Sequence, residues 1–173
     1  MITLRIVPAT APDVPIILRM IRGLAEYEQL LDACSATEDQ LRESLFGAHP
    51  AAEVLLAWAD DRPVGFALFF HNYSTFLAQR GLYLEDLFVL PEWRGHGVGR
   101  RLLERLAQIA IDRDCGRLEW TVLDWNTAAI GFYQRIGATP MDDWTIYRLT
   151  GDPLRRLASG PRQPATSNPQ PAS

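Results

Sequence analysis

A glycine-rich stretch in the middle of the chain carries the groups best suited to binding an anion. It runs Arg94-Gly95-His96-Gly97-Val98-Gly99-Arg100 and leads directly into an amphipathic helix. A glycine-rich turn at a helix N-terminus leaves several backbone N–H groups without partners, and the helix dipole adds positive potential there. Because Arg94 and Arg100 add full positive charge, we expect this loop to bind a phosphate group.

Two common phosphate-binding patterns do not fit this loop. A dinucleotide fingerprint, G-x-G-x-x-G, would need a glycine where Arg100 stands, and a P-loop would need G-K-[ST] at its end. The pattern that does fit is Arg-x-x-Gly-x-Gly, formed by Arg94, Gly97 and Gly99. Taken alone, the loop is also compatible with a strand-to-helix turn that is merely rich in glycine.

Two carboxylates, Glu85 and Asp86, lie inside an otherwise apolar segment just before the loop. Residues 82–89 alternate like a strand, which would place Glu85 on one face and Asp86, with Leu84 and Phe88, on the other. We expect burial and the neighbouring Asp86 to raise the pKa of Glu85 toward neutrality, as a general base requires. The pair could also draw a cationic substrate into an acidic cleft, or simply face solvent at a strand edge.

Other polar residues have a structural and a functional interpretation side by side. Tyr27 and Glu28 fall near the C-terminal end of a long helix, where negative charge opposes the dipole and indicates either tolerated surface or a cation site. Asn126 is suited to cap a short helix, and Tyr133 lies on that helix at the spacing of a core aromatic. The histidines, at positions 49, 71 and 96, have no metal-ligand spacing, so we expect no metal site.

The composition limits the classes of partner. The chain has 173 residues, 47% of them hydrophobic, with a formal net charge of -4 and a pI near 5.4. It has no excess of basic residues, which disfavours nucleic acid and anionic membranes as partners. No apolar run is long enough to span a membrane, the first residues do not resemble a signal peptide, and Cys34 and Cys115 form no C-x-x-C motif. We therefore expect a reduced, cytoplasmic protein.

The hydrophobic pattern predicts an α/β fold in which a mixed sheet has helices on both faces. Strands are expected at residues 2–7, 52–59, 64–71, 82–89, 117–123 and 143–150, and helices at 12–31, 37–46, 98–112, 127–136 and 153–158. A capping box of Thr37 and Gln40 begins the second helix, and Gly137 ends the fourth. We expect a single domain over residues 1–158, followed by a disordered, proline-rich tail at 159–173.

Two motifs together resemble the signatures of the GNAT superfamily of acyl-CoA N-acyltransferases. The first is Arg94-x-x-Gly97-x-Gly99, and the second is Asn126 followed seven residues later by Tyr133. The resemblance covers residues 2–158 and implies a mostly antiparallel central sheet, with acetyl-CoA as the co-substrate. It further implies a set of residues that contact acetyl-CoA, namely Leu87, Phe88, Val89, Arg94, Gly95, His96, Gly97, Val98, Gly99, Arg100, Asn126 and Tyr133.

Short stretches outside these motifs resemble one branch of the superfamily, the diamine acetyltransferases that act on spermidine, spermine and thialysine. These stretches are Leu82-Tyr83-Leu84-Glu85-Asp86, Asp124-Trp125-Asn126, Phe132-Tyr133 and Pro8-Ala9-Thr10. The resemblance implies that the substrate contacts Tyr27, Glu28, Glu85 and Asp86. It also implies Glu85 as the base, acting through a water, Tyr133 as the general acid, and a homodimer. The chain departs from the polyamine enzymes at Thr145 and Tyr147, where they have an acidic residue and a tryptophan.

These observations predict an enzyme that transfers an acetyl group from acetyl-CoA to the primary amine of a small cationic substrate. A diamine, a polyamine or a lysine-like amino acid fits this description. Two alternatives stay open: the acceptor is a protein, peptide or drug amine, or the chain is an acyl-CoA-binding module without catalysis. The presence of both Glu85 and Tyr133 favours the enzyme.

Overall fold

The computed structural model describes residues 2–160, so that residues 161–173, which make up most of the predicted tail, lie outside the described part. The described chain forms two compact units that divide between Leu123 and Asp124, and each unit is described by itself. In chain order the elements are β1 (Leu4–Pro8), η1 (Ala11–Asp13), α1 (Val14–Tyr27), η2 (Leu31–Ala33), α2 (Glu38–Phe46), β2 (Glu53–Ala59), β3 (Arg62–Ser74), β4 (Gln79–Val89), η3 (Pro91–Trp93), α3 (Val98–Asp112), β5 (Leu118–Trp120), α4 (Thr127–Arg135) and α5 (Gly151–Ser159).

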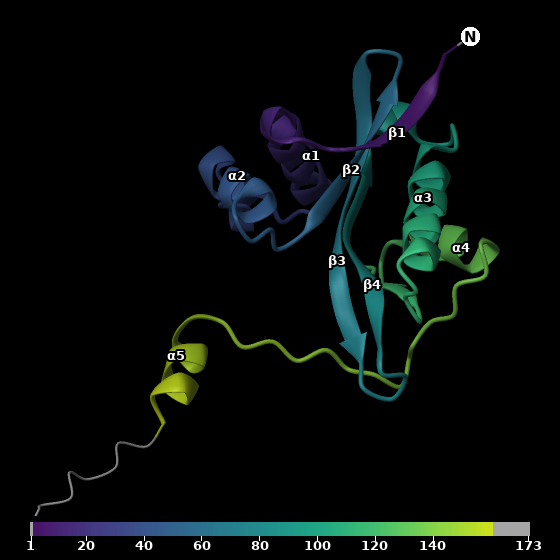
Figure 1. Cartoon of the computed structure of the whole chain (residues 1–173). Helices are drawn as coiled ribbons and strands as arrows, with labels where there is room; N and C mark the ends of the chain where they lie inside the picture. Colours follow the sequence, from purple (N-terminus) through teal and green to yellow (C-terminus); the bar gives the residue numbers. More distant parts are fainter. Residues whose placement is uncertain (1, 161–173) are drawn as a thin grey trace, which may run out of the picture. The chain divides into compact units, whose positions relative to one another are not determined.

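The first unit is built on one five-stranded sheet with the order β1-β2-β3-β4-β5. Neighbouring strands from β1 to β4 are antiparallel, and β5 runs parallel to β4. Figure 1 shows α1 and α2 on one side of this sheet and α3 on the other. The predicted mixed, mostly antiparallel sheet with helices on both faces is therefore confirmed.

Helices α1 and α3 hold the two faces of the sheet through apolar stripes. The buried residues of α1 include Ile17, Met20 and Leu24, which pack with the buried Phe66 and Phe88 of the sheet. From α3 the buried residues are Val98, Leu102, Leu103, Leu106, Ile109 and Ala110. Each fully buried aliphatic or aromatic side chain contributes about 1.5–3 kcal/mol, so these stripes fix both helices against the strands that carry the candidate site.

The capping box that begins α2 is confirmed. The backbone N–H of Gln40 donates to Oγ1 of Thr37 at 3.3 Å, and the Thr37 N–H donates to Oε1 of Gln40 at 3.0 Å. The hairpin between β3 and β4 extends beyond the predicted strands at 64–71 and 82–89, because residues 72–74 also pair with residues 79–81. Asn72 donates from Nδ2 to Oε2 of Glu119 at 2.8 Å, while its buried Oδ1 has no hydrogen-bond partner among the described residues.

The second unit contains α4 and α5, joined by an irregular segment. The strand predicted at residues 143–150 is not formed, although these residues alternate as a strand would. A strand needs a hydrogen-bonded neighbour, and the described residues supply none for this segment. Large apolar side chains are left exposed there, with Trp144 72% and Tyr147 92% accessible. The short helix predicted at 153–158 is confirmed as α5.

Candidate functional site

Glu85 occupies a β-bulge in the central strand β4. Leu84 pairs with Phe69 and Asp86 pairs with Leu68, so Glu85 has no residue opposite it on β3. A bulge shifts the alternation of side chains by one residue and bends the strand. The regular alternation predicted for residues 82–89 is therefore wrong beyond Leu84, because Asp86 lies on the opposite face from Leu84.

The bulge leaves the side chain of Glu85 exposed and that of Asp86 partly buried. Burial, followed by the negative charges of Glu85 and Glu28, raises the pKa of Asp86 from 3.8 to about 6. Burial also raises the pKa of Glu28. The prediction that Glu85 is the buried carboxyl is therefore wrong, and burial acts on Asp86 instead. The negative charges of Glu85 and Glu28 both act on Asp86, and three carboxyl groups in one region are suited to a cation.

The end of α1 lies beside the glycine-rich loop. Tyr27 is the last residue of α1, and the N–H of Glu28, which caps the helix, donates to the carbonyl of Leu24 at 2.9 Å. The guanidinium carbon of Arg94 lies 4.3 Å from the centre of the Tyr27 ring. Two residues predicted to bind the substrate, Tyr27 and Glu28, are thus brought to the loop predicted to bind phosphate. No local pattern indicates this contact between residues far apart in the sequence.

One edge of β4 is open next to the carboxylates. The parallel strand β5 pairs with β4 only at Leu82, Tyr83 and Leu84. From Glu85 onward, no described residue of the first unit pairs with this edge, so alternate backbone groups can bond to another molecule. The open edge includes backbone groups of Leu87 and Val89, which are predicted to contact acetyl-CoA. Phe88, also predicted to do so, faces β3 with its backbone, in the same phase as Leu90, whose N–H donates to the Val64 carbonyl, and its side chain is buried.

The loop from Gly95 to Gly99 has the geometry of an anion site. Gly95 and Gly97 have φ angles of 77° and 79°, in the left-handed region that other residues adopt only with strain. A Cβ added at either glycine would meet no atom within 4 Å, so the loop borders open space. The first helix bond runs from the N–H of Arg101 to the carbonyl of Gly97, which leaves the N–H groups of Val98, Gly99 and Arg100 for an anion.

The charged side chains of the loop have partners within the protein. Arg94 donates from Nε to the carbonyl of Val89 at 3.1 Å, and Arg100 forms an exposed ion pair with Glu104 at 2.9 Å. Nδ1 of His96 lies 2.9 Å from the carbonyl of Arg94, so Nδ1 carries the proton and donates it. Exposed ion pairs contribute little free energy, about 0–1 kcal/mol, so Arg100 can exchange Glu104 for a phosphate at small cost.

The second unit holds the two remaining predicted site residues. Oδ1 of Asn126 accepts a hydrogen bond from the N–H of Ala129 at 3.3 Å, which confirms its capping position at the start of α4. Tyr133 lies on the same helix, partly buried, with its ring 5.5 Å from that of Phe132. These contacts establish a structural position for both residues and leave their predicted roles toward acetyl-CoA as predictions.

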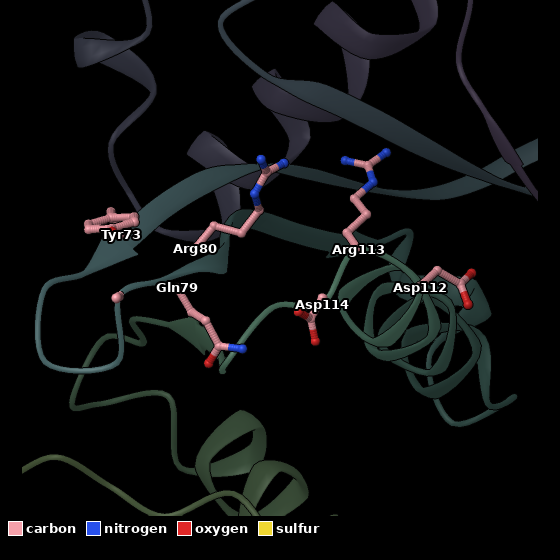
Figure 2. Close-up of a pocket in the computed structure, with 7 residues that line it drawn as sticks. Tyr73, Gln79, Arg80, Asp112, Arg113 and Asp114 are labelled. Atoms are coloured by element: carbon pink, nitrogen blue, oxygen red, sulfur yellow. The ribbon is translucent and has the colours of Figure 1, made fainter.

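A separate depression lies at the other end of α3, where the helix finishes rather than where the loop begins. It is lined by Tyr73, Ala78, Gln79, Arg80, Asp112, Arg113 and Asp114, all from the first unit (Figure 2). Arg113 also forms an ion pair with Glu53 and lies 3.1 Å from Nε2 of His71. These contacts tie α3 to the sheet, and we assign them a structural role.

Within residues 2–160, no group of three or more His, Cys, Asp or Glu side chains is placed to hold a metal ion. In the same part of the chain, no helix combines the length and the apolar character needed to cross a membrane.

Comparison with known proteins gives consistent matches over most of the chain. Residues 22–138 match the model of the acetyltransferase (GNAT) family. A thialysine N-epsilon-acetyltransferase of Bos taurus is 40% identical over 153 residues, which cover 82% of this chain and 89% of that protein. An L-ornithine N5-acetyltransferase of Arabidopsis thaliana is 33% identical, covering 88% of this chain and 87% of that protein.

Solved structures share the fold. An integron cassette protein from the mobile metagenome of V. cholerae superimposes with a TM-score of 0.77 at 30% identity, covering 90% of this chain and 97% of that one. An aminoglycoside acetyltransferase from a soil metagenome, solved with trehalose, superimposes with a TM-score of 0.73 at 18% identity, covering 85% of this chain and 95% of that one. The second likeness extends to the fold alone.

Proposed function

Because the chain belongs to the GNAT acetyltransferase family, we propose that it transfers an acetyl group from acetyl-CoA to the primary amine of a small cationic substrate. The observation that carries this proposal is the region formed by Glu28, Glu85 and Asp86. It lies in the same unit as the open edge of β4 and the glycine-rich loop. An acidic region beside a phosphate-binding loop fits an amine acceptor next to a CoA donor.

The names of the relatives support an amino acid or polyamine as the acceptor. They are acetyltransferases of thialysine and of L-ornithine, together with a spermidine/spermine N(1)-acetyltransferase-like protein that is 35% identical. The chain covers only 23% of that last protein, so its likeness carries less weight. Thialysine and ornithine both end in a primary amine that is cationic at neutral pH, and three clustered carboxyl groups would attract such a substrate.

The reaction requires a neutral amine. An alkylamine with a pKa of about 10.4 is neutral in only about one molecule in 2500 at pH 7, which corresponds to roughly 4–5 kcal/mol. Glu85 would accept the amine proton through a water, since it is exposed at the bulge beside Asp86. The amine nitrogen then forms a bond to the acetyl carbon, and the bond from that carbon to sulfur breaks.

The groups that would bind acetyl-CoA are the loop and the open edge of β4. Acetyl-CoA supplies the acetyl group as a thioester. The N–H groups of Val98, Gly99 and Arg100 would bind its pyrophosphate, which fits the open space beside Gly95 and Gly97. The backbone N–H of Val89, which faces the open edge, would donate to the carbonyl oxygen as negative charge develops on it. Asn126 would contact the pantetheine arm, beside its capping role.

Tyr133 would donate a proton to the sulfur that leaves. Reference pKa values put a phenol about 1.5 units above a thiol, so complete transfer costs roughly 2 kcal/mol, and a hydrogen bond to the sulfur would supply part of the effect. The support for Tyr133 is its position in the family motif, seven residues after Asn126.

We further propose that residues 1–158 act as one catalytic domain in a cytoplasmic homodimer. The support for the dimer is the resemblance to the diamine acetyltransferases, together with the apolar side chains that the second unit leaves exposed, such as Trp144, Ile146 and Tyr147. Association would remove this apolar surface from water.

The test of the function is release of free CoA thiol from acetyl-CoA with a panel of amines. The panel contains thialysine, ornithine, lysine, putrescine, spermidine, an aminoglycoside and a basic peptide. Turnover with a small amine that falls at least about tenfold in both Glu85→Gln and Tyr133→Phe, about 1.4 kcal/mol each, supports the mechanism. Saturable acetyl-CoA binding without turnover of any amine would overturn it in favour of a binding module, and turnover of the peptide alone in favour of a protein acceptor.

A further inference from the structure

Arg94 connects the glycine-rich loop to the helix that carries the predicted acceptor residues. Its backbone begins the loop: the N–H donates to the carbonyl of Pro91 at 3.2 Å, and the carbonyl accepts from His96. Its side chain extends in the other direction. The guanidinium carbon lies 4.3 Å from the centre of the Tyr27 ring and 5.6 Å from that of Phe88. The backbone of Arg94 thus belongs to the loop, and its side chain contacts both Val89, at the end of β4, and Tyr27, at the end of α1.

The contact with Tyr27 has a defined geometry. Nε of Arg94 donates to the carbonyl of Val89 at 3.1 Å, which fixes the guanidinium at the end of β4. Tyr27 is fixed in turn because it ends α1, whose buried residues pack on the sheet. A planar guanidinium over an aromatic face is attracted by the ring, more strongly when water is excluded. The stack is therefore a specific link, and a lysine at position 94 would not reproduce it.

The link continues from Tyr27 to the acidic region. Glu28 follows Tyr27 directly and caps α1, and its negative charge contributes to the raised pKa of Asp86. A change in the loop that moves Arg94 would therefore be transmitted to Tyr27, then to Glu28. An amine bound at the acidic region would act on the loop through the same contacts. The effect of each ligand on the affinity for the other must be equal, because coupling between two binding sites is reciprocal.

We propose that Arg94 is a positioning residue that couples the two substrate sites, so that binding of CoA and binding of the amine strengthen each other through its stack on Tyr27. This inference rests on the proposed function, since it needs a CoA site at the loop and an amine site at the acidic region. The contact is already formed without substrates, so each bound substrate would act on it by shielding it from water rather than by forming it. With both substrates bound, less water would reach the stack than with either one alone, and the contact between guanidinium and ring strengthens as water is excluded.

The test is calorimetric titration of CoA, which cannot acetylate, with and without saturating ornithine or thialysine. The coupling factor is the ratio of the two dissociation constants. We expect CoA to bind the wild type about threefold to tenfold more tightly with the amine present, the range that an exposed to partly desolvated cation–π contact supports. Tyr27→Leu and Arg94→Gln should each bring the factor close to one, and the double variant should lose no more than either single one.

Two control variants separate the stack from other effects. Tyr27→Phe keeps the ring face and should keep the coupling. Saturable binding of CoA to Tyr27→Leu without the amine would show that the leucine variant is folded. Arg100→Gln removes a loop arginine that pairs with Glu104 and does not stack, so it should weaken CoA binding and leave the coupling factor unchanged. A factor of one in the wild type, or an undiminished factor in Tyr27→Leu, would overturn the inference. Because the turnover assay is separate, failure of the coupling leaves the proposed function standing.

Discussion

Replacing Asp86 by asparagine should make the protein more stable at neutral pH while weakening its binding of a cationic amine. In the folded protein the pKa of Asp86 is raised from 3.8 to about 6, chiefly by burial and then by Glu85 and Glu28. Ionised Asp86 is therefore disfavoured in the folded state relative to the unfolded state. Asparagine has nearly the same shape and never ionises, so it avoids this cost and also loses the charge that attracts the amine.

The size of the effect follows from the difference between the two pKa values. Each pKa unit is worth 1.36 kcal/mol, so ionising Asp86 costs the folded state on the order of 3 kcal/mol. The folded state binds more protons than the unfolded state between pH 3.8 and about 6, so wild-type stability falls as pH rises through that window. The advantage of Asp86→Asn should be about 3 kcal/mol at pH 8 and about half of that at pH 5.

The assay is urea unfolding of the wild type and Asp86→Asn at several values from pH 5 to pH 8, without substrates. Glu85→Gln is the matched control, because Glu85 is the adjacent carboxyl and is exposed. Its stability relative to wild type should change much less with pH. If the difference between Asp86→Asn and wild type were the same at pH 5 and pH 8, or if the variant were less stable at pH 8, the account of a buried, ionised Asp86 would be refuted.

Three further substitutions test other parts of the structure. Gly97→Ala places a side chain at a φ of 79° with open space around it, so the free energy of unfolding should fall by only about 1 kcal/mol. The free energy of CoA binding, measured by titration, should fall by more than that. Unchanged CoA affinity would contradict the assignment of the loop to phosphate binding. Gly65→Ala brings a Cβ to 2.8 Å from the carbonyl oxygen of Phe88, so the melting temperature should drop by the equivalent of about 1–3 kcal/mol, and a neutral effect would refute that close approach. Glu53→Gln breaks the half-exposed ion pair with Arg113 and should lower the free energy of unfolding, measured in urea at pH 7, by about 0.5–1 kcal/mol. Because Arg113 lowers the pKa of Glu53, the stability difference between wild type and variant should shrink as the pH falls through that lowered pKa. A stability difference that grows on acidification would argue against the pair.

The parts of the site that the sequence predicts well are those set by local signals. The glycines at 95 and 97 require positive φ, and the helix after them shows a clear apolar stripe, so both the loop and α3 are found from the sequence alone. The cap formed by Thr37 and Gln40 depends on residues three apart, and it is also found. The family is recognised from motifs of the same local kind, and the comparisons confirm it.

The parts that the sequence misses depend on partners far along the chain. The bulge at Glu85 is a property of the register between β3 and β4, and regular alternation cannot show where one residue is skipped. This single residue decides which carboxyl is buried. The contact of Arg94 with Tyr27 likewise depends on how α1 packs on the sheet. The segment at 143–150 has the alternation of a strand and no described partner, so pattern alone predicts it wrongly.

The open edge of β4 also matters for solubility. An unpaired strand edge is a template on which another chain can add a strand, and charged side chains at such an edge oppose that aggregation. Glu85 and Asp86 directly follow Leu84, the last residue of β4 that pairs with β5. The carboxylates proposed to attract the amine therefore also oppose the addition of another strand at this edge. A variant in which both carboxylates are neutralised would therefore precipitate more readily, even though neutralising Asp86 makes the fold more stable.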